Sequence, residues 1–245
     1  MKIVLLGYGK MGQQIEQFAQ KRGHEIQLIV DKENRESITA EDLRGADVAI
    51  DFSEPAAAIN NISLCFEANL PIVVGTTGWY EHLEEIKSVC EEAEQSLLYG
   101  SNFSIGVNVF FHVNRLLAKA MAPYKQYDVQ VEEIHHIHKL DSPSGTAITI
   151  AEGILDGIDD KSKWINNLIG EGEELVPKAD ELLIESHRID EVPGTHTVLY
   201  SSEVDQIEFK HTAHSRAGFA LGAVIAAEWL QGKKGFYQVT EMFDF

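Results

Sequence analysis

The chain has 245 residues, and its 39 acidic side chains outnumber its 20 basic ones, which gives a net charge of −19 at pH 7. With no run of lysine or arginine, this charge argues against a nucleic acid or an anionic membrane as the partner. The 44% hydrophobic and 24% charged content is typical of a folded globular protein. No apolar run approaches the roughly 18 residues of a membrane span.

The first apolar run ends at Gly7 and is too short for a signal-peptide core. Cys65 and Cys90 lie in helix-like contexts and have no spacing typical of a zinc site, so we expect two buried, reduced thiols. Both observations favour a cytoplasmic protein.

The first hundred residues alternate between short apolar runs and helical patterns. Strands are predicted at 3–6, 25–30, 48–52, 71–74 and 96–99, with helices at about 11–19, 55–68 and 80–94. Short, continuously apolar strands between helices indicate an α/β domain with a parallel sheet covered on both faces.

The pattern changes after residue 103. A long helix at 107–121 is followed by a strand at 127–134, a helix from about 146, and a polar, acidic, weakly patterned segment at 157–181. Strands are then predicted at 182–188, 195–201 and 204–212, with a final helix at 219–230. Three successive strands without intervening helices predict an antiparallel sheet, and therefore an α+β domain beginning near residue 104.

A glycine-rich turn follows the first strand and opens the first helix. It reads Gly7-Tyr8-Gly9-Lys10-Met11-Gly12, and Asp31 ends the second strand. The first glycine permits the tight turn, the second lets a pyrophosphate approach the backbone, and the third lets the helix pack closely on the strand. In this context the motif predicts a dinucleotide-binding domain of the Rossmann type, with phosphates at the helix N-terminus.

Cofactor preference depends on Asp31 and its neighbour Lys32. A carboxylate at this position accepts hydrogen bonds from the adenosine ribose and repels a 2′-phosphate, whereas an adjacent lysine can bind one. The pair predicts that both NADH and NADPH are accepted, although Lys32 could also be a solvated surface side chain.

A second glycine-rich segment, Gly75-Thr76-Thr77-Gly78, follows the fourth strand at the sheet edge where α/β proteins bind ligands. It could lie against ribose or nicotinamide. It could equally be a tight turn with Thr77 as the N-cap of the next helix.

Three histidines lie together in the segment from Glu133 to Thr146. His135 and His136 face opposite sides of a regular strand, whereas His136 and His138 share a side, and a loop would free this geometry. Histidine is suited to proton donation near neutral pH, and Lys139 could bind a carboxylate or donate a proton.

The same segment continues through Pro143 and Ser144 to Gly145-Thr146 at the start of a helix, whose free N–H groups could bind an anion. The alternatives are that Ser144 or Thr146 only caps the helix, that the histidines are surface residues, or that His135, His136 and His138 with Asp141 hold a metal ion. We favour no metal, because sequence places no further ligand.

Several motifs together resemble the dihydrodipicolinate reductase family. These are the first glycine motif, the G-T-T-G after strand four, Asn102-Phe103-Ser104, the segment E-x-H-H-x-x-K-x-D-x-P-S-G-T-A at 133–147, and a final helix preceded by Ser215-Arg216. The resemblance covers the whole chain, and its histidine-to-threonine segment is highly specific.

The resemblance implies a Rossmann domain of residues 1–103 and 215–245 and a substrate-binding and oligomerisation domain of residues 104–214 with an open mixed sheet. It implies NADH- or NADPH-dependent reduction of 4-hydroxy-tetrahydrodipicolinate, a small dicarboxylate of diaminopimelate and lysine biosynthesis, by a homotetramer. His135 would be the proton donor and Lys139 the second donor, with His136, Gly145 and Thr146 binding substrate. The cofactor residues would be Gly7, Tyr8, Gly9, Lys10, Met11, Gly12, Asp31, Lys32, Gly75, Thr76, Thr77, Gly100, Ser101, Asn102 and Phe103.

The chain departs from the commoner family pattern in four places. The glycine loop is one residue shorter, Lys10 replaces a frequent arginine, Ser142 stands where alanine is usual, and the region 157–181 is short and acidic. The loop change bears on the balance between NADH and NADPH. Other functions compatible with the sequence are an amino-acid or aspartate-type dehydrogenase, a dinucleotide sensor without turnover, and a metal-dependent hydrolase.

Overall fold

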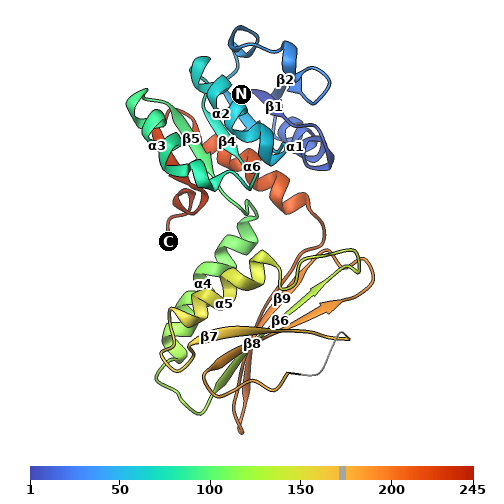
Figure 1. Ribbon diagram of the computed structural model, residues 1–245, viewed down its shortest axis with the longest axis vertical. Coiled ribbons are helices and arrows are strands. Elements are labelled where there is room, and N and C mark those ends of the chain that lie inside the picture. The colour runs from blue at the N-terminus through green and yellow to red at the C-terminus, as the bar shows by residue number, and fades with distance from the viewer. Residues whose placement is uncertain (171–174) are drawn as a thin grey trace. The chain divides into compact units, whose positions relative to one another are not determined.

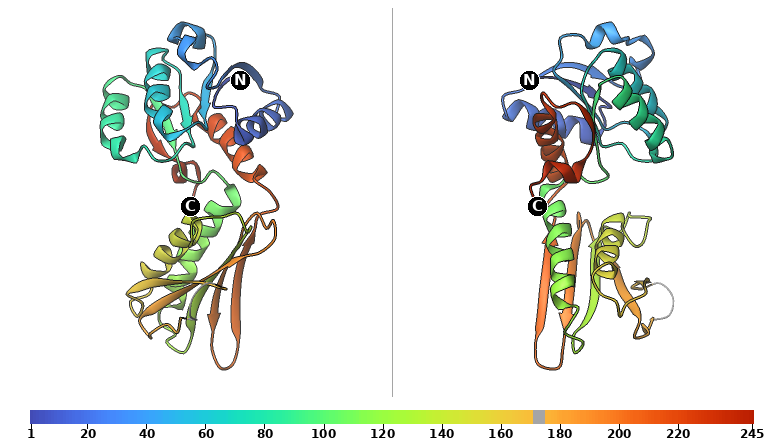
Figure 2. Two further views of the ribbon diagram at one scale, coloured as in Figure 1. Left: turned by 45° about the vertical axis from the view of Figure 1, so that its right-hand side comes forward. Right: turned by 90° about the vertical axis from the view of Figure 1, so that its left-hand side faces the viewer.

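The computed structural model describes residues 1–170 and 175–245, which form two compact units (Figure 1). Unit 1 comprises residues 1–105 and 216–245, and unit 2 comprises residues 106–215. Figure 2 shows the elements of each unit from two further sides. The acidic segment predicted at 157–181 includes residues 171–174, which lie outside the described residues.

Unit 1 is built on a six-stranded parallel sheet in the order β11-β5-β4-β3-β1-β2. Its strands are β1 (Lys2–Leu6), β2 (Glu25–Val30), β3 (Val48–Asp51), β4 (Ile72–Val74), β5 (Ser96–Tyr99) and β11 (Gly235–Gln238). The predicted parallel α/β fold is confirmed. The analysis of the sequence missed β11, because Gly-Phe-Tyr-Gln has no continuous apolar run.

Two helices cover each face of this sheet. Helices α1 (Lys10–Lys21) and α6 (Ala217–Leu230) pack on one face, and α2 (Pro55–Glu67) and α3 (Leu83–Glu92) pack on the other. Along β1, Ile3 and Leu5 face α1 and α6, whereas Val4 and Leu6 face α2 and α3. Because both faces are buried from Ile3 to Leu6, the strand is apolar at each of these positions.

The polar stretches between these elements contain short 3₁₀ turns. They are η1 (Arg35–Ser37), η2 (Ala40–Leu43), η3 (Tyr80–His82) and η4 (Val239–Met242). The first two lie between β2 and β3.

Unit 2 contains a five-stranded mixed sheet in the order β10-β9-β6-β8-β7. Its strands are β6 (Asp128–His135), β7 (Lys163–Leu168), β8 (Glu181–Arg188), β9 (Thr195–Ser201) and β10 (Gln206–Thr212). The expected antiparallel pairing of β8 with β9 is wrong, because β6 lies between them. Strand β6 runs parallel to β8 and antiparallel to β9, so the open mixed sheet implied by the family resemblance is confirmed.

Helices α4 (Ile105–Met121) and α5 (Gly145–Leu155) cover one face of this mixed sheet (Figure 1). Side chains alternate along β6, so Val129 and Val131 enter the core under these helices and Glu133 and His135 follow on the same face. The strand thus carries an apolar row that ends in two buried ionisable groups.

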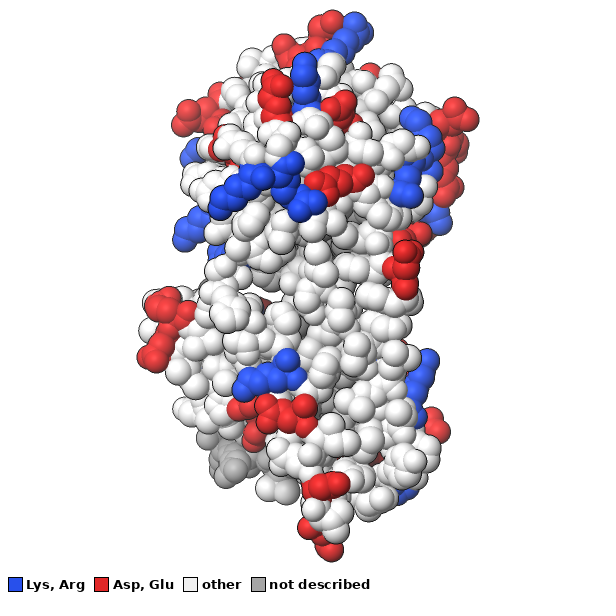
Figure 3. All heavy atoms as spheres, turned by 180° about the vertical axis from the view of Figure 1, so that it is seen from behind, with Lys and Arg blue, Asp and Glu red and all other residues white. Residues whose placement is uncertain are grey.

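The surface is mixed in charge on the face shown in Figure 3, where most basic side chains of the described residues lie beside acidic ones. Among the described helices, none combines the length and the apolar character needed to cross a membrane.

Candidate active site

The glycine motif forms a close turn between β1 and α1. Gly7 has φ of +94°, and a Cβ there would lie 2.3 Å from the carbonyl oxygen of Phe52. A Cβ at Gly12 would lie 2.3 Å from the Gly7 carbonyl oxygen, so the helix can pack on the turn only without a side chain. At Gly9 a Cβ would meet nothing within 4 Å, which leaves the backbone open to a ligand.

A cavity of about 380 Å³ lies beside this turn at the carboxyl ends of the strands. It is lined by Gly7, Tyr8, Gly9, Val30, Asp31, Lys32, Arg35, Phe52, Ser53, Glu54, Ala57 and Asn61. Five predicted cofactor residues are therefore brought together, including Asp31 and Lys32 at the end of β2. The open glycine backbone can donate N–H groups to phosphates, and the Asp31 carboxylate can accept hydrogen bonds from ribose hydroxyls. The lining therefore fits a dinucleotide.

Arg35 also lines the cavity, and the analysis of the sequence did not identify it. Its Nε donates to Asn61 Oδ1 at 2.8 Å, and an Nη atom donates to the carbonyl oxygen of Asn60 at 3.2 Å. These contacts hold the guanidinium against α2. The sequence around this arginine gives no signal for a site, because the residues between β2 and β3 are mostly polar and weakly patterned.

Ten predicted cofactor residues lie outside the cavity lining, and their contact with a cofactor stays a prediction. They are Lys10, Met11, Gly12, Gly75, Thr76, Thr77, Gly100, Ser101, Asn102 and Phe103. The Thr76 hydroxyl accepts from Ser53 N at 2.8 Å and donates to Asp51 Oδ1 at 3.3 Å. Gly75 makes room for the Phe52 ring, since a Cβ there would lie 2.1 Å from it. Thr77 is exposed and does not cap the next helix, which begins after η3.

Asp51 is a fully buried carboxyl group at the end of β3. Burial raises its pKa to about 6, and hydrogen bonds from Ser53, Thr76 and Asn61 oppose that rise only in part. One oxygen, Oδ2, has no hydrogen-bond partner among the described residues. The carboxyl group therefore titrates near neutral pH beneath the glycine-rich turns.

In unit 2, the C-terminal end of strand β6 carries a cluster of ionisable side chains. Glu133 and His135 are 0% and 8% exposed, and His196, opposite Glu133 on β9, is 5% exposed. His135 Nδ1 lies 3.2 Å from Glu133 Oε2, and the two histidine rings meet edge-to-face with centroids 5.1 Å apart. Arg188, opposite His135 on β8, lies 3.3 Å from Glu133 Oε1.

These contacts fix the charges of the cluster. Burial alone would raise the pKa of Glu133, but hydrogen bonds from His135, Ser144 and Ser186 hold it well below its usual range. Burial, together with the nearby His135, lowers the pKa of His196 to about 3. At neutral pH, Glu133 is therefore ionised and His196 is neutral.

The turn after β6 places the other predicted residues. Lys139 Nζ donates to both carboxylate oxygens of Asp141, at 2.8 and 2.7 Å, and its side chain is 18% exposed. His138 pairs with Glu191 at 2.9 Å. His136 is half-buried, and its buried Nδ1 has no hydrogen-bond partner among the described residues. Since the strand ends at His135, it is the member of the 135–138 histidine segment that enters the buried cluster, beside His196.

Helix α5 begins at Gly145, and Ser144 is its N-cap. The Ser144 hydroxyl accepts from Ala147 N at 3.2 Å, and Ser144 N donates to both oxygens of Glu133 at 3.1 Å. Thr146 therefore does not cap the helix. A Cβ at Gly145 would meet nothing within 4 Å, so the first turn of α5 is open to a ligand at Gly145 and Thr146.

The chain was compared with known proteins. Residues 1–103 match the family model described as dihydrodipicolinate reductase, N-terminus, and residues 106–243 match the model of its C-terminus. The chain belongs to the dihydrodipicolinate reductase family. The family predicted from the sequence motifs is thus confirmed, and the chain is an oxidoreductase of this family.

Relatives of this family resemble the chain over nearly its full length. It is 47% identical to the 4-hydroxy-tetrahydrodipicolinate reductase of Christiangramia forsetii, over 99% of this chain and 97% of that protein. Identity to the enzyme of the same name from Akkermansia muciniphila is 37%, over 96% and 94%. The solved dihydrodipicolinate reductase of Paenisporosarcina sp. TG-14, with dipicolinate bound, shares the fold at a TM-score of 0.78 and 23% identity, covering 99% of this chain and 100% of that one.

Within the reductase fold, sequence reasoning missed three members of the buried cluster. Glu133 was quoted in the histidine motif without a role, and Arg188 and His196 were read only as strand residues. The sequence does contain a signal for His196. This histidine alternates with Val198 and Tyr200 on one face of β9, so the strand pattern places it on the buried face. Only strand pairing brings β8 and β9 to the two sides of β6.

The alternative of a metal ion bound by His135, His136, His138 and Asp141 is not supported, because these four side chains do not form one group of ligands among the described residues. Instead, Glu133, His135 and His196 place ligand atoms within 4.8 Å of one another. The same carboxylate already binds the Arg188 cation, a hydroxyl and a backbone N–H. This donor set is typical of a buried ion-pair network, and we assign no metal to it.

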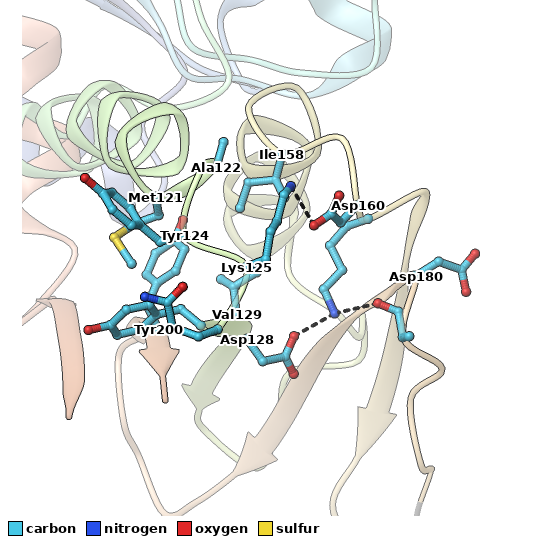
Figure 4. Close-up of a pocket in the computed structure, with 14 residues that line it drawn as sticks. Met121, Ala122, Tyr124, Lys125, Asp128, Val129, Ile158, Asp160, Asp180 and Tyr200 are labelled. Carbon is cyan, nitrogen blue, oxygen red and sulfur yellow. Dashed lines mark hydrogen bonds and ion pairs between the residues drawn. The ribbon is translucent and has the colours of Figure 1, made fainter. Parts of the chain in front are cut away.

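A second cavity, of about 450 Å³, lies in unit 2 where α4 ends and β6 begins (Figure 4). Lys125 pairs there with Asp160 at 2.6 Å, and Lys161 with Asp128 at 2.7 Å. Each lysine is neutralised by an aspartate, and none of the predicted site residues lines this cavity. The candidate cofactor site is therefore assigned to the glycine turn of unit 1, and the candidate substrate site to the histidine cluster of unit 2.

Proposed function

We propose that this chain reduces 4-hydroxy-tetrahydrodipicolinate with NADH or NADPH, the reduction step of diaminopimelate and lysine biosynthesis. The observation that carries the proposal is the buried His135 at the end of β6, beside the open first turn of α5. A proton donor and an anion-binding helix terminus on one short segment suit a dicarboxylate substrate that must be protonated. The names of the relatives support the same reaction.

Unit 1 is proposed to bind the cofactor, which supplies a hydride when bound. The backbone at Gly9 and the N-terminus of α1 would hold the phosphates, and the Asp31 carboxylate would accept hydrogen bonds from the ribose hydroxyls. Lys32, with Arg35 in the same cavity, would bind a 2′-phosphate. This arrangement supports use of both NADH and NADPH.

Unit 2 is proposed to bind the substrate. The N–H groups of Gly145 and Thr146 and the Thr146 hydroxyl would bind one carboxylate, with His136 as a further ligand. His135 would hold the proton that is transferred, and Lys139 would be the second donor after leaving Asp141. The net charge of −19 repels a dianion, so these local donors must overcome it.

The test is cofactor oxidation, followed at the nicotinamide absorbance band, on the freshly generated product of the preceding synthase. NADH and NADPH are compared in parallel, and amino acids and aspartate are the comparison substrates. Oxidation that needs the synthase product supports the proposal. Turnover only with amino acids, or cofactor binding without turnover, would overturn it.

The resemblance to the family also suggests a cytoplasmic homotetramer. The face of the unit 2 sheet opposite α4 and α5 supports assembly, because no described helix packs on it. Light scattering of the purified protein tests this, and a monomer would contradict it.

A further inference from the structure

Glu133 is held rigidly next to His135. Its Oε1 accepts from Ser186 Oγ at 2.9 Å and from both Arg188 Nη atoms at 3.3 Å, and Ser144 N reaches both oxygens at 3.1 Å. Strand β8 and the N-terminus of α5 thus orient one fully buried carboxylate. The oxygen on the side away from Arg188, Oε2, lies 3.2 Å from His135 Nδ1, which is ion-pair distance, and Nδ1 has no hydrogen-bond partner among the described residues.

A carboxylate held in this way dictates which ring nitrogen of His135 carries a proton in the neutral state. An ionised carboxylate only accepts hydrogen bonds, so its negative charge 3.2 Å from the buried Nδ1 favours a proton on that nitrogen over a lone pair. His196 is 3.8 Å from the same oxygen and contacts the Ser144 hydroxyl at 3.1 Å, so it does not displace His135. The exchangeable position on His135 is then Nε2.

The Nε2 side of the ring faces Gly194, the residue before β9. Gly194 has φ of +151°, and a Cβ there would lie 3.1 Å from His135 Nε2. Glycine is thus favoured by the backbone and also leaves this nitrogen uncrowded. The two nitrogens have different surroundings, a carboxylate at Nδ1 and a bare backbone at Nε2.

We propose that Glu133 is a positioning residue, which fixes His135 with Nδ1 protonated so that Nε2 delivers the proton of the reduction. The inference rests on the proposed role of His135. The cofactor would supply the hydride and its two electrons when bound; on the protein side, the Nε2–H bond of the doubly protonated His135 ring breaks and leaves the neutral ring with its proton on Nδ1. The Nε2 proton goes to the substrate atom that gained charge, the electron pair stays on Nε2, and solvent restores the proton.

Among the charged groups around His135, Glu133 is the one that favours a proton on the ring. Arg188 faces it from β8, His196 from β9 and Lys139 from the turn after β6, and His211 on β10 lies near His196. The two cations disfavour a protonated ring, whereas Glu133 is the carboxylate within ion-pair distance of it. Glu133→Gln removes that negative charge, and the pH dependence of kcat reports the effect on proton delivery by His135.

The first experiment compares the pH dependence of kcat in Glu133→Gln, Glu133→Asp and Glu132→Gln. Glu132 is the neighbouring residue on the opposite face of β6, where it pairs with His187, and serves as the matched control. We expect Glu133→Gln to lower kcat about tenfold or more at pH 7 and to move the alkaline fall of kcat to lower pH, with NADH affinity unchanged. Glu133→Asp keeps the charge and should keep the wild-type profile, as should Glu132→Gln.

A purely structural role for Glu133 predicts a lower melting temperature of Glu133→Gln with an unmoved pH profile, and that result would overturn the inference. If Glu133→Gln does not fold, ¹⁵N NMR of the histidine-labelled wild-type protein decides, with the His135 signal assigned by its loss in His135→Gln. A neutral ring protonated at Nδ1 supports the inference, and one protonated at Nε2 refutes it. Full activity of His135→Gln would instead remove the proposed role of His135 itself.

Discussion

The buried Asp51 should make unit 1 less stable as the pH rises. An ion-paired carboxylate, whose pKa is lowered, has the opposite effect. Burial raises the pKa of Asp51 from an ordinary 3.8 to about 6. A difference of this size corresponds to about 3 kcal/mol between the two protonation states. The folded state binds the proton more tightly than the unfolded state, so this stability is present below pH 3.8 and is lost as the pH rises through about 6.

Asp51→Asn removes the titration while it keeps the size of the side chain. Relative to this variant, wild type should lose about 2 kcal/mol of unfolding free energy between pH 4.5 and 8. Urea unfolding at several pH values measures the difference, and the tryptophan fluorescence includes Trp79, which is buried and donates to the Thr76 carbonyl at 2.8 Å. The exposed Asp159 provides the control Asp159→Asn, with the same charge change on the surface of unit 2.

A free-energy difference between wild type and Asp51→Asn that stays constant from pH 4.5 to 8 would refute the reasoning. It would mean that the carboxyl group is ionised without penalty in the folded protein, and so that its environment is more polar than its burial indicates.

Three further predictions concern the proposed site. His135→Gln should lower kcat ~10²–10⁴-fold and leave NADH binding intact, and unchanged turnover would exclude His135 from proton transfer. Asp31→Ala should weaken NADH more than NADPH and Lys32→Ala the reverse, measured as Kd; equal losses for both cofactors would show that the ribose contact is wrongly assigned. Thr146→Val should weaken a pyridine dicarboxylate inhibitor by roughly 1.5–3 kcal/mol without lowering Tm, whereas Ser144→Ala, which removes the cap, should lower stability by about 1 kcal/mol. A Thr146→Val protein with wild-type affinity would contradict the substrate contact.

The sequence by itself determined the local features of the fold. The continuous apolar runs of unit 1 indicated a sheet buried on both faces, and the glycine spacing indicated the close turn that Gly7 and Gly12 make. Both are short-range effects, since backbone sterics and alternation act within a few residues. The family followed from the segment between Glu133 and Thr146, because its residues lie consecutively in the chain.

Only the tertiary structure decided which distant residues share a site. The order of strands in unit 2 was mispredicted, because adjacency in sequence favoured pairing of β8 with β9, whereas β6 lies between them. That insertion places Arg188 and His196 on either side of Glu133 and His135, so the charge state of the cluster depends on contacts made across three strands. The depth of burial of Asp51 and Glu133 was also undetermined, since a carboxyl group in a sequence does not reveal whether packing removes it from water.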